Sequence, residues 1–222
     1  MGDDARSGAA GSVGDTFLAR LLSSPEGRRR MLSISVDAEE GDEAGVFDQL
    51  ARCVEDPGLR RVVLRHRDDE RRHAAMFRGC LARLGLDKEE IPSELRIIRE
   101  IASGPAPARR IETADDIVRT YATLLAIEER GVERFPRIAE AFRPHDPETA
   151  EVYLRVARDE RGHVRYCNRI GRHYARDDAA WDDAVAAARA AEEAAFIRTG
   201  VAAVARATEA GLVDMGDVLP GS

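Results

Sequence analysis

Two short stretches, DDERRHAAMF at residues 68–77 and RDERGHVRYC at residues 158–167, share the pattern Asp-Glu-Arg-x-His. In each copy the Glu and the His are three residues apart, which places both side chains on one face of an α-helix, on adjacent turns. A single Glu-x-x-His arises easily by chance in a charged helical chain. When Glu70 is aligned with Glu160, however, the two halves resemble each other over about fifty residues. Two copies in corresponding positions of such a repeat favour one shared site.

The chain marks its helix starts with capping residues followed by proline. Ser24-Pro25, Asp56-Pro57 and Asp146-Pro147 each combine an N-cap residue with Pro at the first helical position. Thr113 and Asp116 have the spacing of a capping box. These signals predict helices over residues 25–55, 57–85, 113–143 and 147–175, and an Ala-rich stretch predicts a fifth over about 178–211.

The connections between these helices predict the fold class. Two short hairpins require two antiparallel pairs, and the long segment 86–112 lets the second pair return beside the first. We therefore expect an all-α fold: an antiparallel four-helix bundle with a long crossover between helices 2 and 3 and an extra C-terminal helix. Residues 16–212 should form one helical domain, with the bundle at about 25–175. Residues 1–15 are expected to be disordered and 213–222 to form a flexible tail.

The composition limits the classes of function. A formal net charge of −7 gives no support for a nucleic-acid partner. No apolar run reaches membrane-spanning length, and the acidic, Gly-rich start has no apolar signal region. The three cysteines are widely separated and odd in number, which argues against a disulfide framework. We therefore expect a cytoplasmic protein without DNA or membrane partners.

Each bundle helix carries ionisable residues in the middle of an otherwise apolar seam. A buried carboxylate loses several kcal/mol of effective solvation, and carboxylates that face one another repel. Two divalent cations would compensate the charge, and carboxylate oxygens with a minority of imidazole suit iron or manganese. Glu40 lies 16 residues before Asp56 and Glu70 lies 14 after it, so the two reach similar heights in an antiparallel pair. Glu128 and Glu160 are related similarly around Asp146.

The motifs DERGH and LAIEERG resemble the ferritin-like superfamily of di-iron carboxylate proteins, in particular bacterioferritin and rubrerythrin. That family binds two metals with one Glu from each of two helices and a Glu-x-x-His from each of the other two. The resemblance implies that Asp69 and Asp159 accept hydrogen bonds from ligand imidazoles and fix their orientation. It also implies a set of six metal ligands: Glu40, Glu70, His73, Glu128, Glu160 and His163.

Four further residues near these positions need an interpretation. Glu43 also lies on the seam, so it is an alternative or additional ligand, or a proton carrier near the site. His66 lies one turn before Glu70, where a buried core histidine is favoured over a seventh ligand. Glu39 and Glu129 are interpreted as solvated surface residues.

The resemblance implies a non-haem di-iron oxidoreductase that reacts with O₂ or peroxide, either a rubrerythrin-like peroxidase or a di-iron monooxygenase. The cofactors would be two iron ions, with Mn/Fe and Mn/Mn as alternatives. Because the chain has no CxxC pair for a rubredoxin-type iron site, electrons would come from an external ferredoxin- or rubredoxin-like donor. A homodimer is compatible with this function.

Two other functions compete with this one. The first is a ferroxidase or iron-storage protein in a cage of about 24 subunits. The long crossover, the fifth helix and a chain longer than that of ordinary ferritins argue against it. The second is a metal-free bundle that serves as an interaction module.

Overall fold

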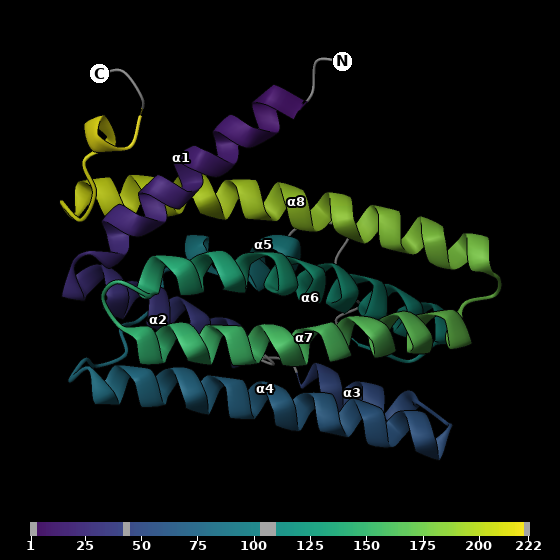
Figure 1. The fold of residues 1–222 in the computed structure, drawn as a ribbon. Helices are drawn as coiled ribbons and strands as arrows, with labels where there is room; N and C mark the ends of the chain where they lie inside the picture. Colours follow the sequence, from purple (N-terminus) through teal and green to yellow (C-terminus); the bar gives the residue numbers. More distant parts are fainter. Residues whose placement is uncertain (1–3, 42–44, 103–109, 220–222) are drawn as a thin grey trace.

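The computed structural model describes residues 4–41, 45–102 and 110–219, and the described part is helical with no strand (Figure 1). The all-α prediction is therefore confirmed. The helices are α1 (Asp4–Leu22), α2 (Pro25–Glu39), α3 (Val46–Cys53), α4 (Pro57–Arg83), α5 (Ile97–Ala102), α6 (Ala114–Phe142), α7 (Pro147–Tyr174) and α8 (Asp178–Glu209). Two 3₁₀ turns, η1 (Ser93–Leu95) and η2 (Met215–Asp217), complete the described elements.

The helix starts follow the local chemistry of the sequence. The side chains of Ser24, Asp56 and Asp146 accept hydrogen bonds from backbone N–H groups in the first turns of α2, α4 and α7, each with Pro next in sequence. Thr113 and Asp116 form the predicted capping box at the start of α6. Such caps satisfy backbone donors that have no partner within the helix.

The first predicted helix is interrupted, so the expectation of one helix over residues 25–55 is wrong. Helix α2 ends at Glu39, and α3 begins only at Val46. Gly45 has a φ of 59°, a left-handed conformation that glycine adopts without the steric cost of a Cβ atom. Gly41 disfavours helix continuation by about 1 kcal/mol relative to alanine. The two glycines therefore account for a break that the apolar periodicity did not reveal.

The described residues near both termini include segments that pack against the core. Residues 4–15 belong to α1 and are helical, whereas we expected disorder. The later part of α1 anchors it, because Leu18, Leu21 and Leu22 are buried. At the other end, Val213 and Val218 are buried in the same apolar cluster, so the expectation of a flexible tail is wrong over that stretch. The buried residues Leu18, Val213 and Val218 thus extend the apolar core toward both termini.

The helices that surround the site pack along one another (Figure 1). Helix α4 runs antiparallel to α2 and α3, contacts both, and also packs against α7. Helices α6 and α7 form the closest pair, and α8 covers α6. Arg130 of α6 and the buried Glu192 of α8 form an ion pair of 2.8 Å that joins these two helices.

The interior consists of two apolar clusters with a band of ionisable residues between them. One cluster includes Phe77 of α4 and Val156 of α7. The other includes Val63 of α4 and Cys167 of α7. Both Glu-x-x-His motifs lie between these boundaries, so each motif is enclosed at both ends by apolar packing. In the part of the chain that the structure describes, no helix is long and apolar enough to cross a membrane.

Candidate metal centre

Seven ionisable side chains converge in the band between the two apolar clusters. In each of two groups, one nitrogen or oxygen atom per residue lies within 4.8 Å of those of the other members. Glu70 belongs to both groups, so the two positions are adjacent and share a carboxylate. The first group consists of His66, Glu70, Glu128 and His163, and the second of Glu39, Glu70, His73 and Glu160.

The first group is centred on two imidazoles. The Nε2 atom of His66 lies 2.9 Å from Oε1 of Glu128 and 3.0 Å from Oε1 of Glu70. The Nδ1 atom of His163 lies 3.2 Å from Oε1 of Glu70 and 3.4 Å from Oε2 of Glu128. The rings of His66 and His163 are 4.1 Å apart between centroids. Two nitrogens and two carboxylates thus approach a common point.

The second group has one imidazole and more oxygen. The Nδ1 atom of His73 lies 3.2 Å from Oε2 of Glu39 and 3.2 Å from Oε1 of Glu160. Glu160 also approaches the first group, since its Oε2 atom is 2.6 Å from Nδ1 of His163. The two positions therefore differ in donor type: the first has two imidazoles, the second one.

Several of these atoms are buried without a hydrogen bond. Among the described residues, Oε1 of Glu70, Oε2 of Glu160 and Nδ1 of His163 have no hydrogen-bond partner, although they lie close to one another. Leaving a buried polar atom unpaired costs about 1–3 kcal/mol, and more for a charged group. Atoms that are close but not aligned for hydrogen bonds have the arrangement expected of ligands directed at a common cation. The donor set therefore fits metal ions.

Two aspartates support the imidazoles from the opposite helix. Nε2 of His73 on α4 lies 3.3 Å from Oδ2 of Asp159 on α7, and Nε2 of His163 on α7 lies 3.5 Å from Oδ2 of Asp69 on α4. Arg72 contacts both aspartates, at 2.6 Å from Asp69 and 3.1 Å from Asp159. In both imidazoles Nδ1 faces the cluster and Nε2 faces an aspartate. Nε2 of His73 is hydrogen-bonded to Asp159, which fixes ring orientation in metal sites, whereas Nε2 of His163 approaches Asp69 without a hydrogen bond.

The protonation of the cluster reflects burial of like charges. Burial, together with the charges of Glu70 and Glu160, raises the pKa of Glu39 well above its usual value. Burial and the charge of Glu160 raise the pKa of Glu128 to about 7. Burial also opposes ionisation of Glu70, but the imidazoles of His163 and His66 outweigh it and lower the Glu70 pKa. The imidazole of His73 is desolvated, yet Glu160 and Glu39 raise its pKa to about 10. Without a cation, the cluster retains protons to balance its charge.

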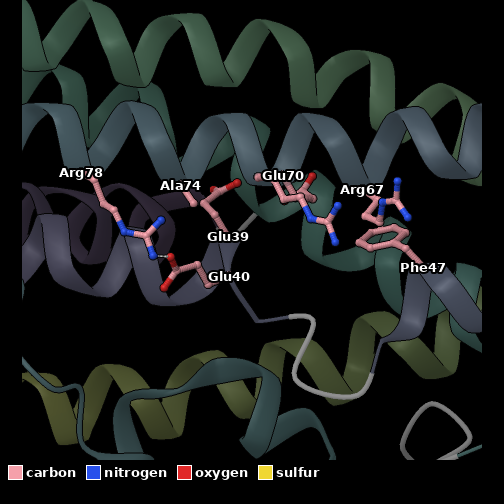
Figure 2. A pocket seen from close by; sticks show the side chains of 8 residues that line it. Glu39, Glu40, Phe47, Arg67, Glu70, Ala74 and Arg78 are labelled. Carbon is pink, nitrogen blue, oxygen red and sulfur yellow. Dashed lines mark ion pairs between the residues drawn. The ribbon is translucent and has the colours of Figure 1, made fainter.

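Of the six ligands that the sequence suggested, five lie in the two groups, and Glu40 does not. Its side chain forms an ion pair with Arg78, as Figure 2 shows, and another with Lys88 at 4.0 Å. Glu43 lies outside the described residues. Glu129 lies outside both groups and pairs with Arg189 of α8 at 2.6 Å.

Glu39 takes the place expected of Glu40, so its interpretation as a solvated surface residue is wrong. It is only 9% exposed and contacts His73. The sequence alignment placed Glu40 over Glu128 because it assumed a continuous helix. Helix α2 ends at Glu39 instead, and the glycines that follow were the signal of that change.

His66 is buried, as the sequence suggested, but it is part of the first group and not of the apolar core alone. Its spacing of four residues before Glu70 placed it on the same helix face. Only the distance to Glu128, 62 residues further along the chain, shows that its ring reaches the cluster.

Comparison with known proteins gives no assignment. No family model matches the chain, and no curated protein or solved structure matches it. The interpretation of this centre therefore depends on the residues, their distances and their burial.

Proposed function

We propose that this protein is a non-haem oxidoreductase of the ferritin-like type, with two metal ions bound inside a four-helix bundle of α2/α3, α4, α6 and α7. Its oxidant would be O₂ or peroxide, and its electrons would come from an external ferredoxin- or rubredoxin-like donor. The observation that carries the proposal is the pair of adjacent donor groups that share Glu70 and contain buried atoms without hydrogen bonds.

The charge of the cluster favours two divalent cations. Glu39, Glu70, Glu128 and Glu160 would carry four negative charges if all were ionised, which two divalent ions would balance. Buried carboxylates of like charge are otherwise costly. Carboxylate oxygens with imidazole nitrogens suit iron, with Mn/Fe and Mn/Mn as alternatives. Bound iron would supply two electrons for reduction of O₂ or peroxide.

The seven residues of the two groups would bind the two ions as follows. His66, Glu128 and His163 would hold one ion, and Glu39 and His73 the other. Glu70, and Glu160 through its contacts with both His73 and His163, lie where they could bind either ion. Asp159 and Asp69 would orient the imidazoles and accept their Nε2 protons.

His66 makes the proposed centre asymmetric. Its Nε2 atom lies 3.0 Å from a carboxylate oxygen of Glu70 and 2.9 Å from one of Glu128. This nitrogen would coordinate the ion of the first group. We therefore include His66 as a seventh ligand. One ion would have two imidazoles and the other a single imidazole in a more oxygen-rich environment.

The experiment that tests this function is metal analysis of protein purified without chelators, followed by anaerobic ferrous loading and exposure to air. We expect about two metal ions per chain and the optical spectrum of an oxo-bridged di-ferric centre. Fewer than about half an ion per chain after loading would contradict the proposal and favour a metal-free bundle.

Size-exclusion chromatography of the loaded protein separates an oxidoreductase from a storage protein. A monomer or dimer is expected for the proposed enzyme. A particle of about 24 subunits that mineralises excess iron would instead assign storage.

A further inference from the structure

A cavity of about 300 Å³ opens beside the candidate metal centre (Figure 2). Its lining includes Glu39 and Glu70, two members of the second donor group. Figure 2 shows these two side chains in the middle of the cavity, with Arg78 and Glu40 toward one end and Phe47 and Arg67 toward the other. A molecule inside the cavity would therefore lie directly against the proposed metal ligands.

The cavity lies between the C-terminal end of α2, the start of α3 and one face of α4. Helix α2 ends at Glu39 and contributes the wall on one side, while α3 contributes Phe47 on the other. The face of α4 that lies opposite the interruption between α2 and α3 forms the rest of the lining. Its residues follow the 3–4 spacing of one helix face: Arg67, Glu70, Arg71, Ala74 and Arg78.

Two of the three arginines in the lining already have close acidic partners. Arg67 lies 2.7 Å from Asp48 and 3.0 Å from Asp68. Arg78 forms an ion pair with Glu40, drawn as a dashed line in Figure 2. The charges of both guanidinium groups are therefore already paired, and these two arginines line the cavity without needing a bound anion.

Arg71 differs from the other two. Its ion pair with Asp68 is 3.8 Å long, and Asp68 is held more closely by Arg67. The Arg71 side chain is 65% exposed, so it can reorient toward an anion at little cost in desolvation. A guanidinium binds a carboxylate through two parallel hydrogen bonds.

Metal binding would remove the negative charges of Glu39 and Glu70 from the lining. The carboxylate that stays in the lining, Glu40, is already paired with Arg78, and Arg67 is paired with Asp48 and Asp68 outside the lining, so Arg71 would be the least tightly paired charge of the cavity. Phe47, which is 6% exposed, and Ala74 would provide apolar contacts next to these charges. The volume lies at the lower end for ligand pockets, which suits a small molecule.

We propose that this cavity binds small organic monocarboxylates, with the carboxylate on Arg71 and the organic part against Phe47 and Ala74. The inference rests on the proposed metal centre, because the bound ions would cancel the negative charges of Glu39 and Glu70 that otherwise repel a carboxylate. Such a monocarboxylate would be the co-substrate that reaches the centre from the side of Glu39 and Glu70.

Calorimetric titration of the anaerobic, metal-loaded full chain with benzoate tests this inference, with benzamide as the uncharged analogue. We expect saturable benzoate binding that is roughly tenfold tighter than benzamide binding, the effect of one charge-assisted contact. Arg71→Gln should weaken benzoate binding by about the same factor. Arg65→Gln, an exposed arginine of the same helix outside the lining, should leave it unchanged.

The absence of saturable benzoate binding, equal binding to Arg71→Gln, or equal binding of benzamide would overturn the inference. Metal content, measured in every sample, separates this failure from failure of the centre itself. Protein that holds its metals but not benzoate contradicts only the carboxylate site. Protein that takes up no metal contradicts the proposed function, and the carboxylate site with it.

Discussion

His73 on α4 is supported by Asp159 on α7, with 3.3 Å between Nε2 and Oδ2. Asp159 directly precedes Glu160, a member of the same donor group as His73. The residue pair Asp159-Glu160 therefore contacts both nitrogens of one imidazole, Glu160 at Nδ1 and Asp159 at Nε2. This geometry lets a change at Asp159 reach the centre without removing a proposed ligand.

Replacement of Asp159 by Asn should weaken metal binding by about 10–100-fold, the range for residues that orient a ligating histidine. The helical content should stay unchanged, because the Asp159 side chain is 34% exposed. Competition with a chromophoric chelator measures the affinity. Asp68→Asn, an exposed neighbour of the equivalent Asp69, is the matched control. Equal affinities of the two variants would contradict a role for Asp159.

The neighbouring residues Glu39 and Glu40 give a direct test of the helix α2 ligand. Glu39→Gln should lower the affinity for at least one ion by roughly tenfold or more, because a buried carboxylate of the second group is lost. Glu40→Gln should have little effect, because its partners are Arg78 and Lys88. Calorimetric titration with metal measures the affinity of each variant. A loss of affinity in Glu40→Gln but not in Glu39→Gln would show that Glu40 is the ligand. Thermal melting of both metal-free variants verifies that the fold is kept.

His66 should affect only one of the two ions. In the cobalt-loaded protein, His66→Gln should change the visible absorption of one cobalt ion. It should also weaken the binding of that ion by about tenfold, because one nitrogen donor is removed. In a cobalt titration, the affinity for the other ion should stay as it is in the parent protein. His173→Gln, an exposed histidine near the end of α7, serves as the control. An unchanged cobalt spectrum in His66→Gln would return His66 to a purely structural role.

Metal binding at pH 7 should release protons. In the metal-free protein the pKa of His73 is raised to about 10 and that of Glu128 to about 7. Both groups therefore hold protons at or below neutral pH, and a metal ion must displace them. Calorimetry in two buffers with different ionisation enthalpies gives the number of protons released. We also expect the apparent affinity to fall as the pH is lowered. A binding enthalpy independent of the buffer would contradict this protonation scheme.

Asp146 should make stability depend on pH in the acidic range. Burial alone would raise its pKa, but Arg83 at 2.5 Å and the N-cap contacts with Thr149 outweigh burial and lower it below 3.8. A lowered folded-state pKa means that the stabilisation is present above about pH 3.8 and is lost as the pH falls through the folded-state pKa. Asp146→Asn should therefore lower the free energy of unfolding by about 1–2 kcal/mol at pH 7, because the charge-assisted hydrogen bond from Arg83 is weakened, whereas Asn can still cap the helix.

Urea denaturation at pH 7 and about pH 3 measures this difference, which should shrink on acidification. Glu148→Gln is the control, because Glu148 contacts the same arginine but is 75% exposed, and exposed pairs contribute less than about 1 kcal/mol. A difference between Asp146→Asn and the parent that stays constant with pH would contradict the role of the Asp146 charge.

The sequence predicted those features that depend on local geometry. Capping residues define where α4, α6 and α7 begin, and the three-residue spacing of Glu and His is a property of any helix. Glu70, His73, Glu160 and His163 were therefore identified correctly as neighbours. The all-α class follows from the same local rules.

What the sequence missed depends on contacts between distant segments. Glu39 and Glu40 are adjacent, and only the end of α2 decides which one turns inward. His66 belongs to the cluster through Glu128 on another helix. The attachment of α1 depends on residues such as Leu18, whose burial involves contacts with distant segments.

The cavity described above touches the second donor group through Glu39 and touches the shared Glu70. Small molecules could approach from the side of Glu39 and Glu70, which line the cavity, whereas His66 and His163 do not line it and are 0% and 2% exposed. The two ions would then have unequal access to solvent: the oxygen-rich position would meet incoming molecules first, and the nitrogen-rich one would be sheltered behind it. Exchange of a bound ion with solution would consequently proceed from one side, so the two positions could be filled and emptied in a fixed order.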